Sequence, residues 1–193
     1  MEWLFAAIAG YLLGSIPFGL LLTRAAGLGD VREIGSGNIG ATNVLRTGNK
    51  PVAAATLALD LAKGLGAVLL AKALWPGAEG AAAIAVVLGH CFPVWLKFKG
   101  GKGVATNAGV SFGLALAIGF TYAAVWLGVL AVLRISSAAG IAAVAAAAIA
   151  AAALGYAEYV LPLAAIALLI IWLHRDNIRR LLKGDEPKVG SKT

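Results

Sequence analysis

Glycines and lysines gather in one short polar stretch between two long hydrophobic segments. The stretch reads Lys99-Gly100-Gly101-Lys102-Gly103, and Lys97 lies just before it. Glycine allows backbone N–H groups to turn toward an anion, and lysine adds positive charge beside them. The pattern differs from a Walker A loop, because Gly103 rather than Ser or Thr follows Lys102. It predicts a phosphate-binding loop. The alternative is a cationic anchor whose lysines face water at a membrane surface.

A second polar loop precedes this stretch and is rich in hydrogen-bonding side chains. It reads Gly35-Ser36-Gly37-Asn38-Ile39-Gly40-Ala41-Thr42-Asn43-Val44-Leu45-Arg46. Ser, Thr and Asn donate directional hydrogen bonds, and the guanidinium of Arg46 can hold a phosphate through two parallel ones. The loop is therefore a second candidate for binding an oxyanion. The alternative is an ordinary loop built from Asx turns.

Two further polar segments lie toward the C-terminus. His174 and Asn177 are three residues apart, which places them on one face of a helix. Arg134, Ser136 and Ser137 form a short segment with one cation and two hydroxyls. These residues are candidates for the same site, although a basic tail is also typical of a membrane anchor.

Charged and nucleophilic residues within the hydrophobic segments have simpler explanations. Asp60 and Lys63 are three residues apart, and charges inside a membrane are costly unless they are functional or paired. A mutual ion pair accounts for them, so we predict a mostly structural role. His90 is expected to be a structural hydrogen-bond partner. It is poorly placed to activate Cys91, the only cysteine, because adjacent helical residues point about 100° apart.

The composition is that of a membrane protein. Hydrophobic residues make up 61% of the chain and charged residues 13%, about half the share in soluble proteins. The segments 3–23, 104–133 and 135–157 contain no charged residue, and about 20 apolar residues cross a bilayer as a helix. We therefore predict an all-α polytopic integral membrane protein with one domain, 1–193. The net charge of +7 does not indicate a nucleic-acid partner, because no aromatic residues alternate with the basic ones.

Seven transmembrane helices are expected. The segment 104–133 would be about 45 Å long as a single helix, longer than a hydrocarbon core of about 30 Å. We therefore divide it in two, with a turn near 118–119. The predicted spans are 3–23, 52–74, 80–96, 104–117, 119–133, 136–154 and 159–173.

With this division nearly all basic residues fall on one side of the membrane. They lie in 24–50, in 97–103, at Arg134 and in the tail after 173, whereas the opposite turns hold none. Because basic loops remain cytoplasmic, we expect the N-terminus outside and the C-terminus inside. The polar segments described above then share the cytoplasmic face.

The sequence contains no motif that is typical of metal, hydrolase or dinucleotide-binding sites. Two histidines and dispersed carboxylates give no spacing typical of a metal site, so none is predicted. The hydrolase elbow, the H-E-x-x-H motif and the dinucleotide-binding fingerprint are absent from the sequence.

Taken together, the motifs resemble those of the bacterial acyl-phosphate:glycerol-3-phosphate acyltransferases, the PlsY family. The resemblance is carried, in order along the chain, by Gly35-Ser36-Gly37-Asn38-x-Gly40-x-Thr42-Asn43-x-x-Arg46, by Gly89-His90-Cys91-Phe92-Pro93 with Lys99-Gly100-Gly101-Lys102-Gly103-Val104-Ala105-Thr106, and by His174-Arg175-x-Asn177-Ile178-x-Arg180-Leu181. It implies a seven-span enzyme of the bacterial plasma (inner) membrane. Such an enzyme moves a fatty acyl group from acyl phosphate to the 1-hydroxyl of glycerol 3-phosphate, in the first step of phospholipid synthesis. The products are lysophosphatidic acid and phosphate, and no cofactor is implied.

Our hypothesis for the site divides the residues among three roles. The catalytic residues are His174, Asn177 and Lys102. The acyl phosphate is bound by Ser36, Gly37, Asn38, Gly100, Gly101, Lys102 and Gly103. Glycerol 3-phosphate is bound by Arg46, Lys99, Ser136 and Ser137. The partners are these two substrates and membrane lipids, and the sequence indicates no particular oligomeric state.

A transporter of phosphate or organophosphate anions is the alternative function. Such a protein also places cations in a helical bundle, but its polar residues lie near the midplane at broken helices. Here the polar segments are predicted at one face.

Overall fold

A computed structural model describes residues 1–190, and the part of the chain that it describes is helical, with no strand. The all-α prediction is confirmed. The predicted domain 1–193 also includes residues 191–193, which lie outside the described residues. The helices are α1 (Glu2–Gly14), α2 (Phe18–Ala25), α3 (Ala41–Val44), α4 (Lys50–Leu74), α5 (Glu79–Cys91), α6 (Val104–Leu114), α7 (Leu116–Leu133), α8 (Ser136–Ala153), α9 (Ala157–Leu173) and α10 (Arg175–Lys183), with short 3₁₀ turns at Val31–Glu33, Leu45–Thr47 and Val94–Leu96.

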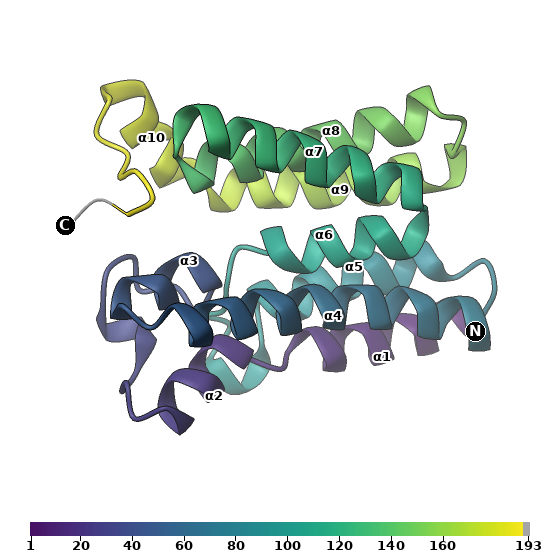
Figure 1. The fold of residues 1–193 in the computed structure, drawn as a ribbon. Helices are drawn as coiled ribbons and strands as arrows, with labels where there is room; N and C mark the ends of the chain where they lie inside the picture. Colours follow the sequence, from purple (N-terminus) through teal and green to yellow (C-terminus); the bar gives the residue numbers. More distant parts are fainter. Residues whose placement is uncertain (191–193) are drawn as a thin grey trace.

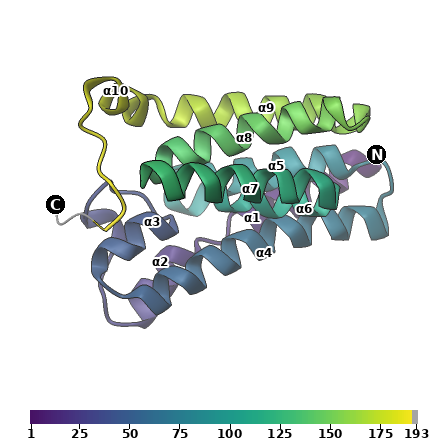
Figure 2. The ribbon, with the colours of Figure 1, turned by 45° about the horizontal axis from the view of Figure 1, so that its top comes forward.

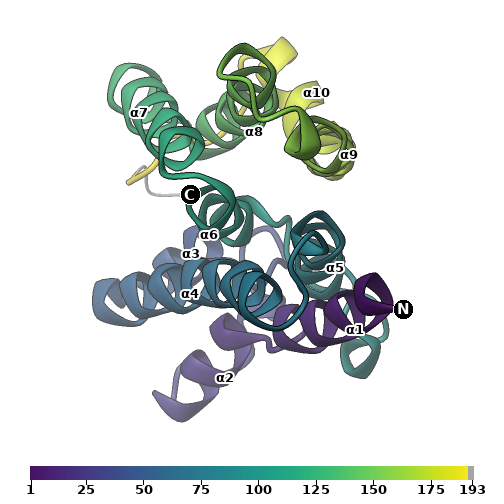
Figure 3. The same cartoon turned by 90° about the vertical axis from the view of Figure 1, so that its right-hand side faces the viewer.

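The long helices run side by side in two groups (Figure 1). Helices α1, α4, α5 and α6 form one group, and α7, α8 and α9 form the other. Viewed along their axes, α6 lies at the junction of the two groups (Figure 3). The short helices α2, α3 and α10 gather at one end of the bundle, opposite the N-terminus. Loops that are far apart in the sequence therefore meet at that end.

Within residues 1–190, five helical segments are long and apolar enough to cross a membrane: Glu2–Ala25, Lys50–Leu74, Glu79–Leu96, Leu116–Leu133 and Ser136–Ala153. A sixth is possible if α9 and α10, bent by 60°, are one span. The predicted span 104–117 begins with α6 but runs past its end at Leu114 into α7. Helix α6 has 11 residues and is about 16 Å long. The count of seven spans stays a prediction.

The turn predicted near 118–119 is wrong, because the chain breaks earlier, at Ala115. This residue has an extended backbone (φ −155°, ψ 139°) between α6 and α7. Gly119 lies in the first turn of α7, where a Cβ atom would come within 2.3 Å of the Phe112 ring. The glycine therefore permits close packing against Phe112 rather than a turn.

The first predicted span, 3–23, is also interrupted. Helix α1 ends at Gly14 and α2 begins at Phe18, after Pro17, which has no N–H to continue the hydrogen-bond ladder. Side chains from other helices bind the carbonyls of the break: Trp95 Nε1 donates to Ser15 O at 2.7 Å and Lys63 Nζ to Ile16 O at 2.9 Å. Bonds of this kind allow irregular backbone inside a membrane protein.

Helices α4 and α6 touch through their backbones at two glycines. A Cβ atom on Gly64 would lie 2.0 Å from Thr106 O, and one on Gly109 would lie 1.9 Å from Leu61 O. Small residues of this kind allow membrane helices to approach closely. Because the lysine-bearing loop leads directly into α6, this contact fixes the loop relative to α4.

Gly64→Ala is predicted to destabilise the bundle, because the added methyl group meets backbone that cannot rotate away. Overpacking of this kind costs about 1–3 kcal/mol, and thermal unfolding in detergent measures it. Gly66→Ala, two residues along the same helix, is the matched control, because nothing lies within 4 Å of its Cβ position. Equal melting temperatures for the two variants would contradict this account of the α4–α6 contact.

Candidate active site

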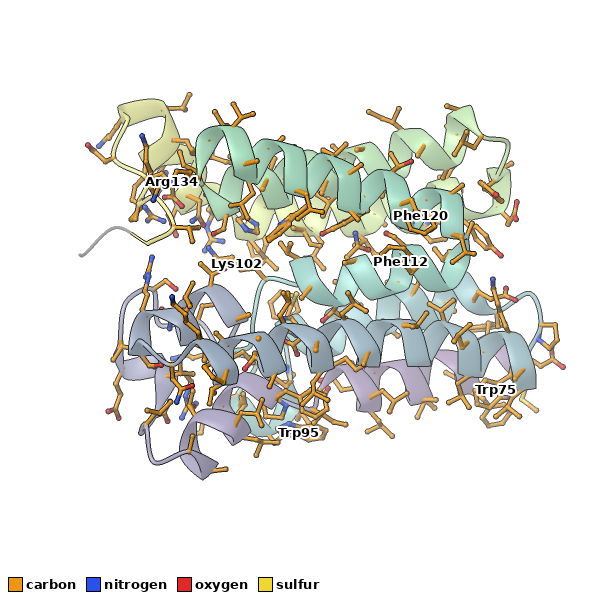
Figure 4. The ribbon with its side chains drawn as sticks, viewed as in Figure 1. Trp75, Trp95, Lys102, Phe112, Phe120 and Arg134 are labelled. Atoms are coloured by element: carbon orange, nitrogen blue, oxygen red, sulfur yellow. The ribbon has the colours of Figure 1, made fainter. Side chains whose placement is uncertain are left out.

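A cavity of about 840 Å³ lies between the two groups of helices, with a polar end and an apolar end. Figure 4 shows Lys102 in the space between the groups, with Phe112 and Phe120 further along the bundle. The polar lining includes Ser36, Asn38, Thr42, Arg46, Lys102, Ser136, Ser137, His174, Asn177, Arg180 and Glu186. The apolar lining includes Leu57, Leu61, Ala105, Ala108, Phe112, Tyr122, Trp126 and Leu127. Four polar segments that are separate in the sequence thus meet in one cavity.

The loop 35–46 is organised around Asn43, which the sequence analysis did not assign to the site. This side chain is 2% exposed. Its amide donates to the carbonyls of Val31 (2.8 Å), Asn38 (2.8 Å) and Ile34 (3.1 Å), and its oxygen accepts from the N–H of Ser36 (3.0 Å). A buried amide with this many partners fixes the loop that carries Ser36 and Asn38 into the cavity wall.

Arg46 lies against the same loop. Its Nη1 lies 3.5 Å from Asn43 Oδ1, at the limit of a hydrogen bond, and a Cβ atom on Gly35 would come within 2.6 Å of the guanidinium. Gly35 also has a positive φ of 53°, which favours glycine. The guanidinium is thus held near the cavity with most of its donors uncommitted.

The glycine loop uses its first two N–H groups for its own structure. Gly100 N donates to Cys91 O at 3.0 Å and Gly101 N to His90 O at 2.9 Å, and neither glycine lines the cavity. Lys102 and Gly103 do line it, and Gly103 is the N-cap of α6. The positive end of the α6 dipole therefore points toward the cavity, a favourable place for an anion.

Lys102, Asn177 and Glu186 form a continuous network across the polar end. Lys102 Nζ donates to Asn177 Oδ1, and Asn177 Nδ2 donates to Glu186 Oε1 at 2.6 Å. Glu186 also accepts from Ser137 Oγ at 2.7 Å and from Arg180 Nε at 2.7 Å. These hydrogen bonds lower the pKa of Glu186 although burial raises it. The network joins the N-termini of α6 and α8 to α10 and the tail.

The tail crosses back over the polar end after α10. Figure 2 shows it running from α10 toward α3. Val189 N donates to Arg134 O at 2.7 Å, and an Arg134 amino group donates to Val189 O at 3.3 Å. Glu186 and Arg180 were not predicted from the sequence as site residues. The available signal was an acidic residue in a basic tail, which is weak because such residues are usually solvated.

His174 is held in one tautomer. Its Nδ1 lies 2.7 Å from Ile170 O, and a carbonyl only accepts, so Nδ1 carries the hydrogen and Nε2 is an acceptor in the neutral ring. Burial lowers the pKa of His174 to about 4, so the ring is neutral at pH 7. Burial also lowers the pKa of Lys102, and the positive charge of Arg180 lowers it further. The cavity therefore offers an imidazole acceptor and a partly desolvated ammonium.

Some predicted site residues lie elsewhere. Lys99 and Gly37 line a separate hollow of about 360 Å³ with Asp30, Arg32 and Glu33. Gly100 and Gly101 pack behind the cavity against His90 and its carbonyl. The remaining predicted residues line the cavity. The roles assigned to all of the predicted site residues stay predictions.

The pairing of Asp60 with Lys63 agrees with the predicted ion pair. Lys63 Nζ lies 2.8 Å from Asp60 Oδ1, and both side chains are buried. Among residues 1–190, no group of three or more His, Cys, Asp and Glu side chains is arranged to hold a metal ion.

A family model described as glycerol-3-phosphate acyltransferase matches residues 4–184. The chain belongs to the glycerol-3-phosphate acyltransferase family. The resemblance found in the sequence is therefore confirmed. A relative of that name from Erythrobacter litoralis is 65% identical over 187 residues, which are 97% of this chain and 95% of the relative. Another from Agrobacterium fabrum is 53% identical over 189 residues, 97% of this chain and 92% of the relative.

Two solved structures are similar to this chain over nearly its whole length. Both are described as PlsY, an integral membrane glycerol 3-phosphate acyltransferase. The glycerol 3-phosphate form has a TM-score of 0.93 and 39% identity, covering 98% of this chain and 96% of that one. The lysophosphatidic acid form has a TM-score of 0.90 and 38% identity, covering 97% and 95%.

Glu186→Gln is predicted to loosen the tail at pH 7, because a neutral amide binds the Asn177, Ser137 and Arg180 donors less strongly. Loss of a hydrogen bond to a charged group costs about 1.5 kcal/mol or more, so amide exchange of residues 185–190 should be about tenfold faster. Asp185→Asn is the control, because that carboxylate makes no contact with the three donors.

The same contacts give the tail a pH dependence. Because the pKa of Glu186 is lowered in the folded protein, its contribution is complete above the unfolded value of about 4.5. It is lost as the pH falls through the lower folded value. The exchange rate of the wild-type tail amides, relative to unprotected amides at the same pH, should therefore rise only below about pH 4.5. An increase in this relative rate between pH 7 and pH 5 that Glu186→Gln does not show would contradict this assignment.

Proposed function

We propose that this protein transfers a fatty acyl group from acyl phosphate to the 1-hydroxyl of glycerol 3-phosphate, giving lysophosphatidic acid and inorganic phosphate. Acyltransferase activity on glycerol 3-phosphate follows from the family. The acyl phosphate donor, the roles of individual residues and the orientation in the membrane are our proposals. The observation that carries them is that one cavity joins clustered phosphate-binding groups to an apolar groove.

The polar end suits two phosphates. Lys102, the N-terminus of α6, Ser36 and Asn38 form one set of donors, which we assign to the acyl phosphate. Arg46 with Ser136 and Ser137 forms the other set, which we assign to glycerol 3-phosphate. Lys99 and the backbone of Gly37 would act from outside the cavity, at the neighbouring hollow.

The apolar end suits an acyl chain. On α6, Ala105, Ala108 and Phe112 follow one another at helical spacing along the lining, and Tyr122 and Trp126 face the cavity from α7. The small residues lie nearer to Lys102, and the ring of Phe112 packs edge-on against Phe120 with centroids 5.4 Å apart. The groove thus begins at the phosphate site and continues toward the bilayer interior.

The chemistry requires positioning and charge stabilisation. The 1-hydroxyl oxygen attacks the acyl carbonyl carbon, the bond from that carbon to the phosphate oxygen breaks, and phosphate leaves with the electron pair. The hydroxyl proton passes to His174 Nε2 or to a substrate phosphate oxygen. In this proposal Lys102 and Asn177 stabilise the developing oxyanion and the leaving phosphate.

The site is proposed to lie on the cytoplasmic face of a bacterial plasma membrane. The basic residues near the site support this orientation, with seven spans, the N-terminus outside and the C-terminus inside. A C-terminal reporter that behaved as extracellular would contradict it. The transporter alternative is not favoured, because the polar groups gather at one end of the bundle rather than at its midplane (Figure 4).

The decisive experiment compares donors with purified protein in detergent. Acyl phosphate, acyl-CoA and acyl-carrier protein are each supplied with glycerol 3-phosphate, and lysophosphatidic acid and phosphate are measured. We expect product from acyl phosphate alone, with phosphate release that depends on glycerol 3-phosphate. Efficient use of acyl-CoA would contradict the proposed donor, and phosphate release without glycerol 3-phosphate would contradict coupled transfer.

Lys102→Ala is predicted to reduce turnover about 10- to 100-fold while the protein still folds, because a lost contact to a charged group costs about 1.5–3 kcal/mol. Arg46→Lys should also be poor, because an ammonium does not reproduce the planar fork of a guanidinium. Lys50→Ala is the control, because Lys50 is exposed and does not line the cavity.

The measurement is kcat/KM for each substrate, with thermal unfolding to verify folding. Near-normal activity of both Lys102→Ala and Arg46→Ala in folded protein would show that these loops are topology anchors rather than phosphate-binding loops.

A further inference from the structure

The buried charges of α4 and α5 have a feature that an isolated ion pair does not require. Asp60 and Lys63 pair at 2.8 Å, and His90 Nδ1 lies 3.6 Å from the same Asp60 oxygen. That separation is too long for a hydrogen bond, and within the described residues His90 Nδ1 has no hydrogen-bond partner. Buried polar atoms without partners are rare enough to need an explanation. Both Asp60 and His90 also line the cavity.

His90 holds the glycine loop in two ways. Its carbonyl accepts from Gly101 N at 2.9 Å, and the next carbonyl, Cys91 O, accepts from Gly100 N at 3.0 Å. The imidazole itself lies against Gly101, where a Cβ atom would be 2.0 Å from Nε2. Gly101 is adjacent to Lys102, so the position of the ring determines where the chain bearing Lys102 can lie.

Asp60 is fixed from the other side. Lys63 binds its carboxylate and also donates to the Ile16 carbonyl in the break between α1 and α2. The Phe18 ring lies 5.6 Å from the same ammonium. A continuous set of contacts therefore runs from the break after α1, through Lys63 and Asp60, to His90 and the glycine loop.

We infer that Asp60 and His90 are positioning residues for the donor-phosphate site. The charge of the Asp60 carboxylate attracts the Nδ1 edge of the imidazole across 3.6 Å without a hydrogen bond. The imidazole and the His90 carbonyl in turn set the position of Gly101, and hence of the Lys102 ammonium at the cavity. Lys63 fixes Asp60 and balances its charge. This inference rests on the proposed function, because it assigns the effect to the acyl phosphate.

If the Asp60–Lys63 ion pair had a purely structural role, the expected result would be different. Replacing a buried ion pair by uncharged residues is often neutral or stabilising, whereas removing one partner leaves an uncompensated charge and is strongly destabilising. The double variant Asp60→Asn/Lys63→Met therefore separates the two cases. If the pair only neutralises itself, this variant should have wild-type kinetics.

The experiment measures both KM values and kcat with acyl phosphate and glycerol 3-phosphate, together with thermal unfolding. We expect Asp60→Asn/Lys63→Met to fold and to lose about 10- to 100-fold in kcat/KM for acyl phosphate, since small misplacements of a contacting group cost that much. The KM for glycerol 3-phosphate should change less than about twofold, because Arg46 and the serines are not held by this chain of contacts.

His90→Phe provides a second, independent test. It keeps a planar ring against Gly101 but removes the nitrogen that Asp60 faces, so it should reproduce the same selective loss. Combined with the Asp60→Asn/Lys63→Met change, the effects should be non-additive, because both act through one contact. Lys72→Met is the matched control: this lysine donates to Leu114 O at 2.8 Å, far along α6 from the loop, and should affect stability alone.

Three results would overturn the inference: wild-type kinetics in Asp60→Asn/Lys63→Met, a wild-type kcat/KM for acyl phosphate in His90→Phe, or additive effects in the combination. If Asp60→Asn/Lys63→Met fails to fold, His90→Phe decides alone. Absence of turnover by the wild-type protein with acyl phosphate would instead contradict the proposed function, so the two failures are distinguishable.

Discussion

The position of helix α6 is the constraint on which the rest of the structure depends. Backbone contacts at Gly64 and Gly109 hold α6 against α4 without intervening side chains. The N-terminus of α6 carries Lys102 and Gly103 into the polar end of the cavity, and its flank provides Ala105, Ala108 and Phe112 to the apolar end. One short helix thus fixes both ends of the proposed substrate site relative to each other.

At the polar end of the cavity, hydrogen bonds between separate segments of the chain hold the loops in place more than hydrogen bonds within a segment do. Asn43 organises the first loop, the carbonyls of His90 and Cys91 organise the second, and Glu186 gathers donors from α8 and α10. Loops alone would be too mobile to place several donors around a phosphate, because ordering each residue costs conformational entropy. Buried amides and a shared carboxylate offset that cost.

A cavity with a polar end and an apolar end matches a substrate with a polar head and an apolar chain. A fatty acyl phosphate has a charged head that needs hydrogen-bond donors and a long apolar chain whose exposure to water is unfavourable. The proposed arrangement places the head at one end of the bundle and the chain between α4, α6 and α7. In the proposed arrangement the neutral imidazole of His174 and the ammonium of Lys102 lie beside the reacting groups, and no proposed step modifies either residue covalently.

The sequence by itself determined the class of protein and the family, and it predicted many of the polar residues that line the cavity. Charge-free segments of membrane-spanning length require helices, and the glycine, lysine, arginine and amide residues are those that bind phosphate, wherever they lie in the chain. Lys102, Arg46, Ser137 and Asn177 were therefore identifiable from residue type and predicted sidedness. Their convergence in one cavity agrees with that reasoning.

Only the tertiary structure decided which donors are free and which are already used. The N–H groups of Gly100 and Gly101 donate to carbonyls of α5, and Lys99 lies at a separate hollow. Asn43 has hydrogen-bond partners up to 12 residues away and Glu186 up to 49, and no local pattern encodes contacts over such separations. The break at Ala115 was missed for the same reason: Gly119 serves packing against Phe112, and a glycine that permits a turn cannot be distinguished in sequence from one that permits a contact.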